Sequence, residues 1–213
     1  MRAAIIGSGA VHDYKLLYDT IVEYDLIICA DGGINHLIKA GVAPNVFIGD
    51  FDSCEFDSVK DHPLLKNCIV RKYNTQKNDT DMQLCIDYAL KQGCTEITLF
   101  AALGGRADHE LSNIFNLKYI LENGAKGLIF SDNNLIYITD SNIKIERREG
   151  FKISLLPLTA MVEGISSTGL YYPLKDDIIY QGTSLGISNE FTEELTEISI
   201  KSGTLLIILS KDE

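Results

Sequence analysis

Acidic residues recur in three short segments of this chain, next to stretches that favour regular secondary structure. The segments are Asp31-Gly32-Gly33, Gly49-Asp50-Phe51-Asp52-Ser53 and Thr80-Asp81. Carboxylates that lie close together repel one another, so a cluster of them needs a cation. Mg²⁺ prefers oxygen ligands and usually takes one or two protein carboxylates together with substrate phosphates. The set therefore predicts a site for Mg²⁺ and a nucleotide.

Two of these segments also have simpler interpretations. Alternate residues of an extended loop share a side, so Asp50 and Asp52 would face one ion. Alternatively, they belong to a turn in which the aspartates are solvated or cap a short helix. After Asp31, two glycines would let the backbone approach a ligand. The alternative there is an ordinary strand-to-helix turn that Asp31 caps.

The segment Gly104-Gly105-Arg106-Ala107-Asp108-His109 has the composition of an open loop that binds an anion. Paired glycines after a strand give a tight turn, and the planar guanidinium of Arg106 suits phosphate. Asp108 would cap the following helix, orient Arg106 or receive a substrate group. The alternative is a purely structural ion pair between Arg106 and Asp108.

A second polar segment, Ser184-Leu185-Gly186-Ile187-Ser188-Asn189, packs small and polar groups into six residues. On its own it is equally well interpreted as a hairpin turn. Two familiar nucleotide motifs are absent from the sequence, since there is no GxxxxGK[ST] segment and Gly7-Ser8-Gly9 lacks the third glycine of a dinucleotide fold. The four histidines show no zinc spacing with cysteine.

Composition narrows the possible partners and the compartment. The formal net charge of the 213 residues is −11, with no basic cluster, which argues against nucleic acid and anionic membrane as partners. An acidic protein that binds a polyphosphate needs a metal to bridge the like charges.

No apolar run reaches the roughly 18 residues that span a bilayer. The five cysteines form no CxxC pair, and we expect reduced thiols in a cytoplasmic protein without a signal peptide.

The pattern of elements predicts an α/β N-terminal domain, residues 1–133, with a mainly parallel sheet. A smaller all-β sandwich domain, residues 134–213, follows it. Short apolar runs alternate with helical patterns in the first part, and short alternating segments with Gly, Asn and Asp between them fill the second. The expected strands are 3–7, 26–30, 46–49, 69–73, 97–101 and 127–130, then 135–139, 144–146, 152–156, 161–163, 178–180, 197–200 and 204–209. The expected helices are 34–40, one capped by Asp79 or Thr80, and 109–122.

Ligands of open α/β sheets bind beyond the carboxyl ends of the strands. Asp31, Asp50, Asp52, Arg106 and Asp108 all follow expected strands directly. Thr80 and Asp81 begin an expected helix, where backbone N–H groups favour anions. The polar groups of these separate segments should therefore meet at one edge of the sheet.

Taken in order, these motifs resemble those of the thiamine pyrophosphokinases over nearly the whole chain. The resemblance rests on Ala30–Asn35, Gly49–Ser53, Thr80-Asp81, Gly104–His109, Gly169–Leu174 and Ser184–Asn189. It implies ATP and thiamine as substrates, AMP and thiamine diphosphate as products, and a homodimer that binds thiamine between subunits. It also implies an N-terminal α/β catalytic domain and a C-terminal thiamine-binding β-sandwich.

The resemblance further assigns roles to individual residues. Asp50, Asp52 and Asp81 would hold Mg²⁺ and the phosphates, and Arg106 would offset charge during transfer. A larger group would contact the nucleotide, the phosphates or thiamine: Asp31, Gly32, Lys77, Thr80, Asp108, Ser184, Ser188 and Asn189.

Two departures from the family leave fine contacts open. Relatives often have an acidic residue directly after the lysine that corresponds to Lys77, whereas here Asn78 follows and the acid is Asp79. The chain also has no tryptophan, which some relatives place near thiamine. Two other functions stay possible from the sequence: pyrophosphoryl transfer to another alcohol such as a hydroxymethyl pterin, and a non-catalytic module that senses thiamine diphosphate or a nucleotide.

Overall fold

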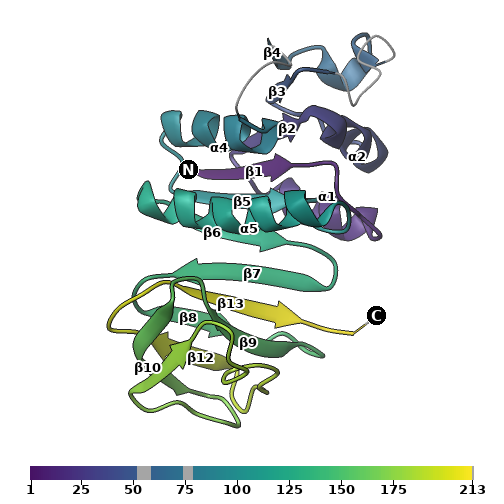
Figure 1. Cartoon of the computed structure of the whole chain (residues 1–213). Coiled ribbons are helices and arrows are strands. Elements are labelled where there is room, and N and C mark those ends of the chain that lie inside the picture. The colour runs from purple at the N-terminus through teal and green to yellow at the C-terminus, as the bar shows by residue number, and fades with distance from the viewer. Residues whose placement is uncertain (52–58, 74–78, 213) are drawn as a thin grey trace. The chain divides into compact units, whose positions relative to one another are not determined.

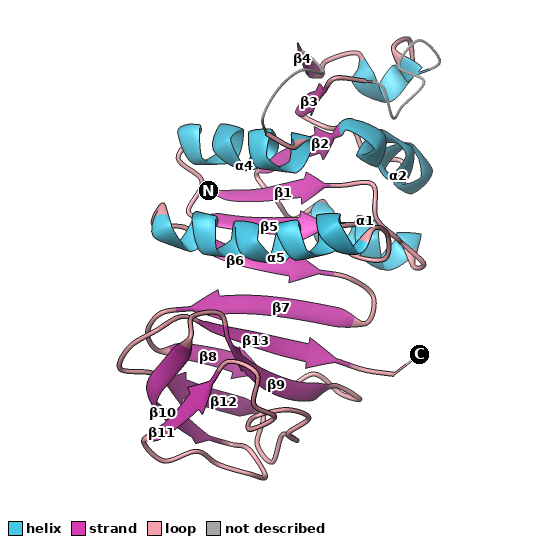
Figure 2. Cartoon of the chain, in the orientation of Figure 1, coloured by secondary structure: helices cyan, strands magenta, loops and turns pink. Residues whose placement is uncertain are grey.

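The structure is a computed structural model that describes residues 1–51, 59–73 and 79–212. It divides into two compact units, Met1–Asp132 and Asn133–Glu213 (Figure 1). The first unit combines helices with a parallel sheet, and the second is built from strands and loops in its described residues (Figure 2). This arrangement confirms the predicted fold class, an α/β part followed by an all-β part.

The first unit contains six parallel strands in the order β4-β3-β2-β1-β5-β6. Central strands are continuous apolar runs because helices cover both faces of the sheet. In β1 every residue after Arg2 is buried, and in β3 all four residues are buried. The strands are β1 (Arg2–Ile6), β2 (Leu26–Ala30), β3 (Val46–Gly49), β4 (Ile69–Lys72), β5 (Glu96–Phe100) and β6 (Lys126–Phe130).

Among the described residues of this unit, two pairs of helices cover the sheet. Helices α1 (Tyr14–Ile21) and α2 (Ile34–Ala40) pack together on the face to which Ala4 and Ile6 of β1 point. Because alternate strand residues face opposite sides, Ala3 and Ile5 point to the other face. Helices α4 and α5 pack together there and lie in front of the sheet in Figure 1. Their bounds are Asp81–Lys91 for α4 and Ala107–Glu122 for α5.

Helix α1 lies in the described part of this unit and was not predicted. Helix α1 has eight residues and buries only Leu17 and Ile21, which is too little apolar periodicity to recognise in the sequence. Its start is nevertheless defined locally, because the Asp13 carboxylate accepts a hydrogen bond from the Leu16 N–H at 2.8 Å. Helix α5 begins at Ala107, two residues before the predicted start, and Arg106 is its N-cap residue.

The second unit consists of two antiparallel sheets, β7-β13-β9 and β11-β10-β12-β8. Strand β10 continues beyond the predicted end at Glu163, because Gly164 (φ +66°) forms a bulge between Glu163 and Ile165 rather than a turn. The strands are β7 (Asn134–Thr139), β8 (Ile143–Glu146), β9 (Lys152–Pro157), β10 (Met161–Thr168), β11 (Asp177–Tyr180), β12 (Leu195–Ser199) and β13 (Leu205–Ser210).

Two further expectations concern the compartment. Among the residues that the structure describes, no helix has the length and apolar character needed to cross a membrane. The four described cysteines, Cys29, Cys68, Cys85 and Cys94, form no disulfide with one another.

Candidate active site

The carboxyl ends of strands β1, β2, β3 and β5 open onto a cleft of about 700 Å³ in the first unit. A volume of this size is typical of sites for small molecules. Its lining comes from the loop after β1, the turn after β2, the end of β3, the start of α4 and the loop between β5 and α5. The lining includes Gly7, Ser8, Gly9, Asp31, Asp50, Thr80, Asp81, Gly105, Arg106, Asp108 and Glu110.

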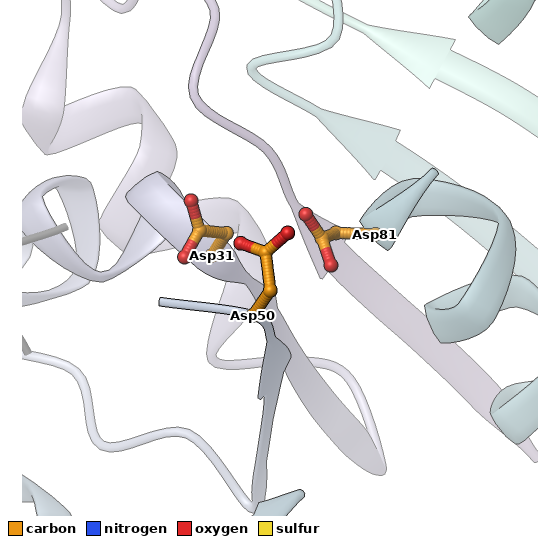
Figure 3. Close-up of side chains that lie close together, drawn as sticks. All are labelled: Asp31, Asp50 and Asp81. Atoms are coloured by element: carbon orange, nitrogen blue, oxygen red, sulfur yellow. The ribbon is translucent and has the colours of Figure 1, made fainter. Parts of the chain in front are cut away.

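Three carboxylates meet in this cleft. One oxygen from each of Asp31, Asp50 and Asp81 lies within 4.8 Å of the others, and the three side chains reach this point from three different elements (Figure 3). Asp31 is only 5% exposed, and its Oδ1 has no hydrogen-bond partner among the described residues. A buried, unpartnered carboxylate oxygen beside two further carboxylates fits a hard cation with oxygen ligands.

The backbone around Asp31 explains how the carboxylates come so close. Asp31 has a positive φ of 36°, in the left-handed region that aspartate tolerates better than most residues. Strand β3 ends at Gly49, where a Cβ atom would lie 3.0 Å from Asp31 Oδ1. The glycine of the Gly49-Asp50 motif is therefore needed for the close approach of β3 to the Asp31 side chain.

Helix α4 brings Asp81 to the cleft at its first turn. The Thr80 hydroxyl accepts a hydrogen bond from the Gln83 N–H at 3.2 Å. Of Asp79 and Thr80, the two residues predicted to cap this helix, Thr80 is the N-cap residue. The N-terminal end of a helix carries partial positive charge and favours anions. Asp81, and any phosphate bound beside Thr80, would both benefit from it.

Arg106 and Asp108 form a bidentate pair at the rim of the cleft. The Arg106 Nε and Nη2 atoms lie 3.1 and 2.6 Å from the two carboxylate oxygens of Asp108. The hydrogen bond from Arg106 lowers the pKa of the Asp108 carboxyl below its usual value. Both side chains are more than half exposed. Asp108 thus orients Arg106, and its Oδ1 also accepts a hydrogen bond from the His109 N–H in the first turn of α5 at 3.0 Å. An exposed guanidinium in this place can meet a phosphate.

Glu110 is a residue of this site that the sequence analysis did not identify. Its Oε1 accepts hydrogen bonds from the backbone N–H groups of Gly104 and Gly105, at 3.0 and 2.7 Å. The carboxylate thereby holds the loop that carries Arg106. The one signal in the sequence was an acidic residue in the first turn of a helix directly after paired glycines.

Residues 17–129 match the family model "Thiamin pyrophosphokinase, catalytic domain" and residues 140–205 match "Thiamin pyrophosphokinase, vitamin B1 binding domain". A thiamine pyrophosphokinase of Bacillus subtilis is 34% identical over 196 residues, which cover 89% of each chain. The chain belongs to the thiamine pyrophosphokinase family.

Solved structures of the family agree in fold. The crystal structure of a thiamine pyrophosphokinase from Bacillus subtilis has a TM-score of 0.90 at 30% identity and covers 100% of both chains. That of a thiamin pyrophosphokinase from Geobacillus thermodenitrificans has a TM-score of 0.86 at 28% identity and covers 100% of this chain and 99% of the other. The complete coverage means that both units of this chain have counterparts in members of the thiamine pyrophosphokinase family.

The thiamine pyrophosphokinase motifs of the first unit converge as far as they are described. Asp31, Gly32 and Gly33 form the short 3₁₀ turn η1 (Asp31–Gly33) after β2. A Cβ atom on Gly32 would lie 3.1 Å from Ser8 Cβ, so Gly32 permits contact with the loop after β1. The predicted site residues that line one cleft are Asp31, Asp50, Thr80, Asp81, Arg106 and Asp108. Asp52 and Lys77 lie outside the described residues.

The predicted residues Ser184, Ser188 and Asn189 belong to the second unit. Ser184 and Ser188 are exposed, and Ser188 has a positive φ of 55°. Asn189 is buried, and its amide makes hydrogen bonds with both the N–H and the carbonyl of Tyr172, at 3.0 and 2.8 Å. In this structure the Asn189 side chain fixes the backbone at Tyr172, whose own side chain is exposed.

Proposed function

We propose that this chain transfers a pyrophosphoryl group from ATP to thiamine, giving AMP and thiamine diphosphate. The observation that carries the proposal is the cluster of Asp31, Asp50 and Asp81 in the cleft of a chain that matches both thiamine pyrophosphokinase family models. The match to a vitamin B1 binding domain favours thiamine over a pterin alcohol. The cluster of Asp31, Asp50 and Asp81 favours an enzyme over a sensor, because a sensor has no need for this set of carboxylates.

In the reaction that we propose, the primary alcohol oxygen of thiamine bonds to the β-phosphorus of ATP. The bond between the β-phosphorus and the oxygen that stays with AMP breaks, and the proton of the alcohol is released to the solvent. Such transfers depend on positioning and on neutralising charge at the phosphate oxygens. Arg106, oriented by Asp108 and exposed at the rim, would contact a phosphate and offset part of this charge.

We assign Mg²⁺ as the cofactor and Asp31, Asp50 and Asp81 as the carboxylates that would hold it. Bound Mg²⁺ would supply charge neutralisation on the phosphates. The unpartnered Oδ1 of buried Asp31 supports adding Asp31 to the metal ligands predicted from the sequence. Asp52 and Lys77 stay predicted contributors to the same site.

We also propose that the chain acts as a homodimer and that Ser184, Ser188 and Asn189 lie near a substrate. Both ideas rest on the family resemblance. Light scattering on the purified protein would give the mass of the assembly, and a mass equal to one chain would contradict the dimer.

Gly32 and Thr80 are assigned to the nucleotide, since both belong to segments at the cleft.

The test of function is a product assay. Purified protein is incubated with ATP, MgCl₂ and thiamine, and the nucleotides and thiamine esters are separated by chromatography. We expect AMP and thiamine diphosphate in equal amounts, both lost on adding EDTA. The Asp50→Asn variant should lose ~100-fold or more of the turnover, while Asp140→Asn, at an exposed position of the second unit, should keep it. ADP with thiamine monophosphate, or no product at all, would contradict the proposal.

A further inference from the structure

The Gly7-Ser8-Gly9 loop after β1 forms part of the cleft without contributing a charged side chain. It is tightly enclosed by its neighbours. A Cβ atom on Gly9 would lie 2.3 Å from the Leu103 carbonyl oxygen, and one on Gly33 would lie 2.1 Å from the Ile6 carbonyl oxygen. The backbones of three loops therefore touch here, and a shift of the Gly7–Gly9 loop would displace the neighbouring walls of the cleft.

A histidine outside the cleft connects this loop to helix α2. His36 Nε2 lies 2.8 Å from the Gly9 carbonyl oxygen, and His36 Nδ1 lies 2.8 Å from the Tyr14 hydroxyl. A carbonyl oxygen can only accept, so Nε2 must carry the proton and donate it. Nδ1 is then the acceptor of the Tyr14 O–H. Helix α1, through Tyr14, thus fixes the tautomer that lets His36 hold the Gly9 carbonyl.

The surroundings of His36 favour the neutral ring over the charged one. Burial lowers the pKa of His36, and the nearby charge of Lys39 lowers it further, against the raising effect of the hydrogen bond to Gly9. Lys39 lies over the Tyr14 ring, with Nζ 5.4 Å from the ring centroid. A neutral imidazole has one donor and one acceptor, which matches the two partners that the structure provides.

We infer that His36 is a positioning residue for nucleotide binding, and this inference rests on the proposed function. His36 is not part of the cleft lining and acts through the Gly9 carbonyl. The loop that it holds lines the same cleft as the carboxylate cluster and Arg106, the groups suited to metal and phosphates. Loss of the His36 hydrogen bond should therefore weaken the site for MgATP and leave the affinity for thiamine as it is.

The test measures KM and kcat for each substrate in four variants. His36→Ala removes the donor and should raise KM for MgATP roughly 3- to 10-fold, the effect expected for one hydrogen bond, with a smaller change in kcat. His36→Gln retains an N–H donor and should restore most of this loss. Tyr14→Phe leaves the ring without its fixed tautomer and should give an intermediate value. His12→Gln, at an exposed histidine, is the matched control and should behave as the wild type.

Binding of a non-hydrolysable ATP analogue with Mg²⁺, measured by calorimetry, gives a readout that is independent of turnover. We expect the same order of affinities: wild type and His12→Gln, then His36→Gln, Tyr14→Phe and His36→Ala.

If the wild type turns over and His36→Ala binds the analogue as well as the wild type does, the inference is wrong and the proposed function stands. Equal rises in KM for ATP and thiamine would also overturn it, since they indicate a general structural role. Should His36→Ala fail to fold, His36→Gln and Tyr14→Phe carry the same comparison. A wild type that binds the analogue but forms no product would refute the proposed function instead.

Discussion

Replacing Asp31 with asparagine should make the protein more stable without metal and less responsive to it. The change keeps the size and shape of the side chain but removes one of three negative charges, whose ligand oxygens lie within 4.8 Å of one another. Asp31 is 5% exposed and its Oδ1 has no partner among the described residues, so nothing described at that atom offsets the repulsion. In the absence of a cation the charge is therefore unfavourable for folding.

The size of this effect follows from Coulomb's law. Two unit charges 4.8 Å apart repel by ~0.9 kcal/mol in water and by ~3.5 kcal/mol at an effective dielectric constant of 20. Asp31→Asn removes two of the three pairs, so the relief lies between ~2 and ~7 kcal/mol. Asp50 and Asp81 are partly exposed, which favours the lower value. A gain of ~2 kcal/mol corresponds to a rise in Tm of roughly 4–8 °C for a chain of this size.

A bound cation should narrow the difference in stability between the two proteins. At ten times its Kd, Mg²⁺ adds ~1.4 kcal/mol to the free energy of unfolding of the wild type, a rise in Tm of roughly 3–5 °C. The variant lacks one ligand and should lose most of that gain. The assay is thermal unfolding in low salt with EDTA or with MgCl₂. Asp140→Asn makes the same change of charge at an exposed position and should show neither effect.

The refuting result is specific. An Asp31→Asn protein that is less stable than the wild type in EDTA, and that still gains the full stabilisation by Mg²⁺, would show that the three carboxylates neither repel one another nor share a cation. The measurement does not use thiamine or ATP, so it tests the metal site apart from the reaction.

Three further predictions concern stability. Thr80→Ala should lower the free energy of unfolding by ~1 kcal/mol in urea titrations, since it removes the cap at the Gln83 N–H; an unchanged midpoint would contradict this. Asn189→Ala removes both hydrogen bonds to the Tyr172 backbone and should lower it by ~2–3 kcal/mol, and a loss below ~0.5 kcal/mol would show the clamp to be unimportant. Because burial lowers the pKa of His36, the folded state binds fewer protons than the unfolded state below about pH 6.5. The contribution of neutral His36 to the free energy of unfolding is present above about pH 6.5 and is lost as the pH falls toward the lower pKa of the folded state. The stability of the His36→Gln variant should therefore fall less steeply with decreasing pH. Parallel pH profiles of the two proteins would refute this role of His36.

Two strands were predictable because nearly all of their residues are buried. Leu26–Ala30 and Val46–Gly49 match β2 and β3 to the residue, because strands covered on both faces must be apolar throughout. Helix α1 escaped prediction because two buried residues do not make a periodic pattern. Strand β10 was predicted too short since a glycine in a sequence indicates either a turn or a bulge, and only the neighbouring strand decides which.

The sequence indicated which residues would gather at the cleft better than it indicated how they are arranged there. The rule that ligands bind beyond strand carboxyl ends predicted that Asp50 and Arg106 would lie at one edge of the sheet, and both line the cleft. Asp81 was expected there because it begins a helix, and it lines the cleft too. The close approach of the Asp31 and Asp50 carboxylates depends on the positive φ of Asp31 and on the missing Cβ of Gly49, and neither is visible in residue types. The Gly7–Gly9 loop was set aside because it lacks a third glycine, yet its place in the cleft comes from its contacts with neighbouring loops.

Strain and repulsion are concentrated at the strand ends that form the cleft. Three residues with side chains, Asp31, Phe51 and Ala101, leave β2, β3 and β5 with positive φ values of 36°, 63° and 48°, and each such conformation costs about 1–2 kcal/mol. At Phe51 the cost is offset by burial, because the ring is 8% exposed and its centroid lies 4.7 Å from that of Phe47, which contributes about 2–3 kcal/mol. With the Phe51 ring anchored in the core, the preceding Asp50 is turned out into the cleft. Apolar packing behind the strand ends therefore holds together carboxylates that would otherwise move apart.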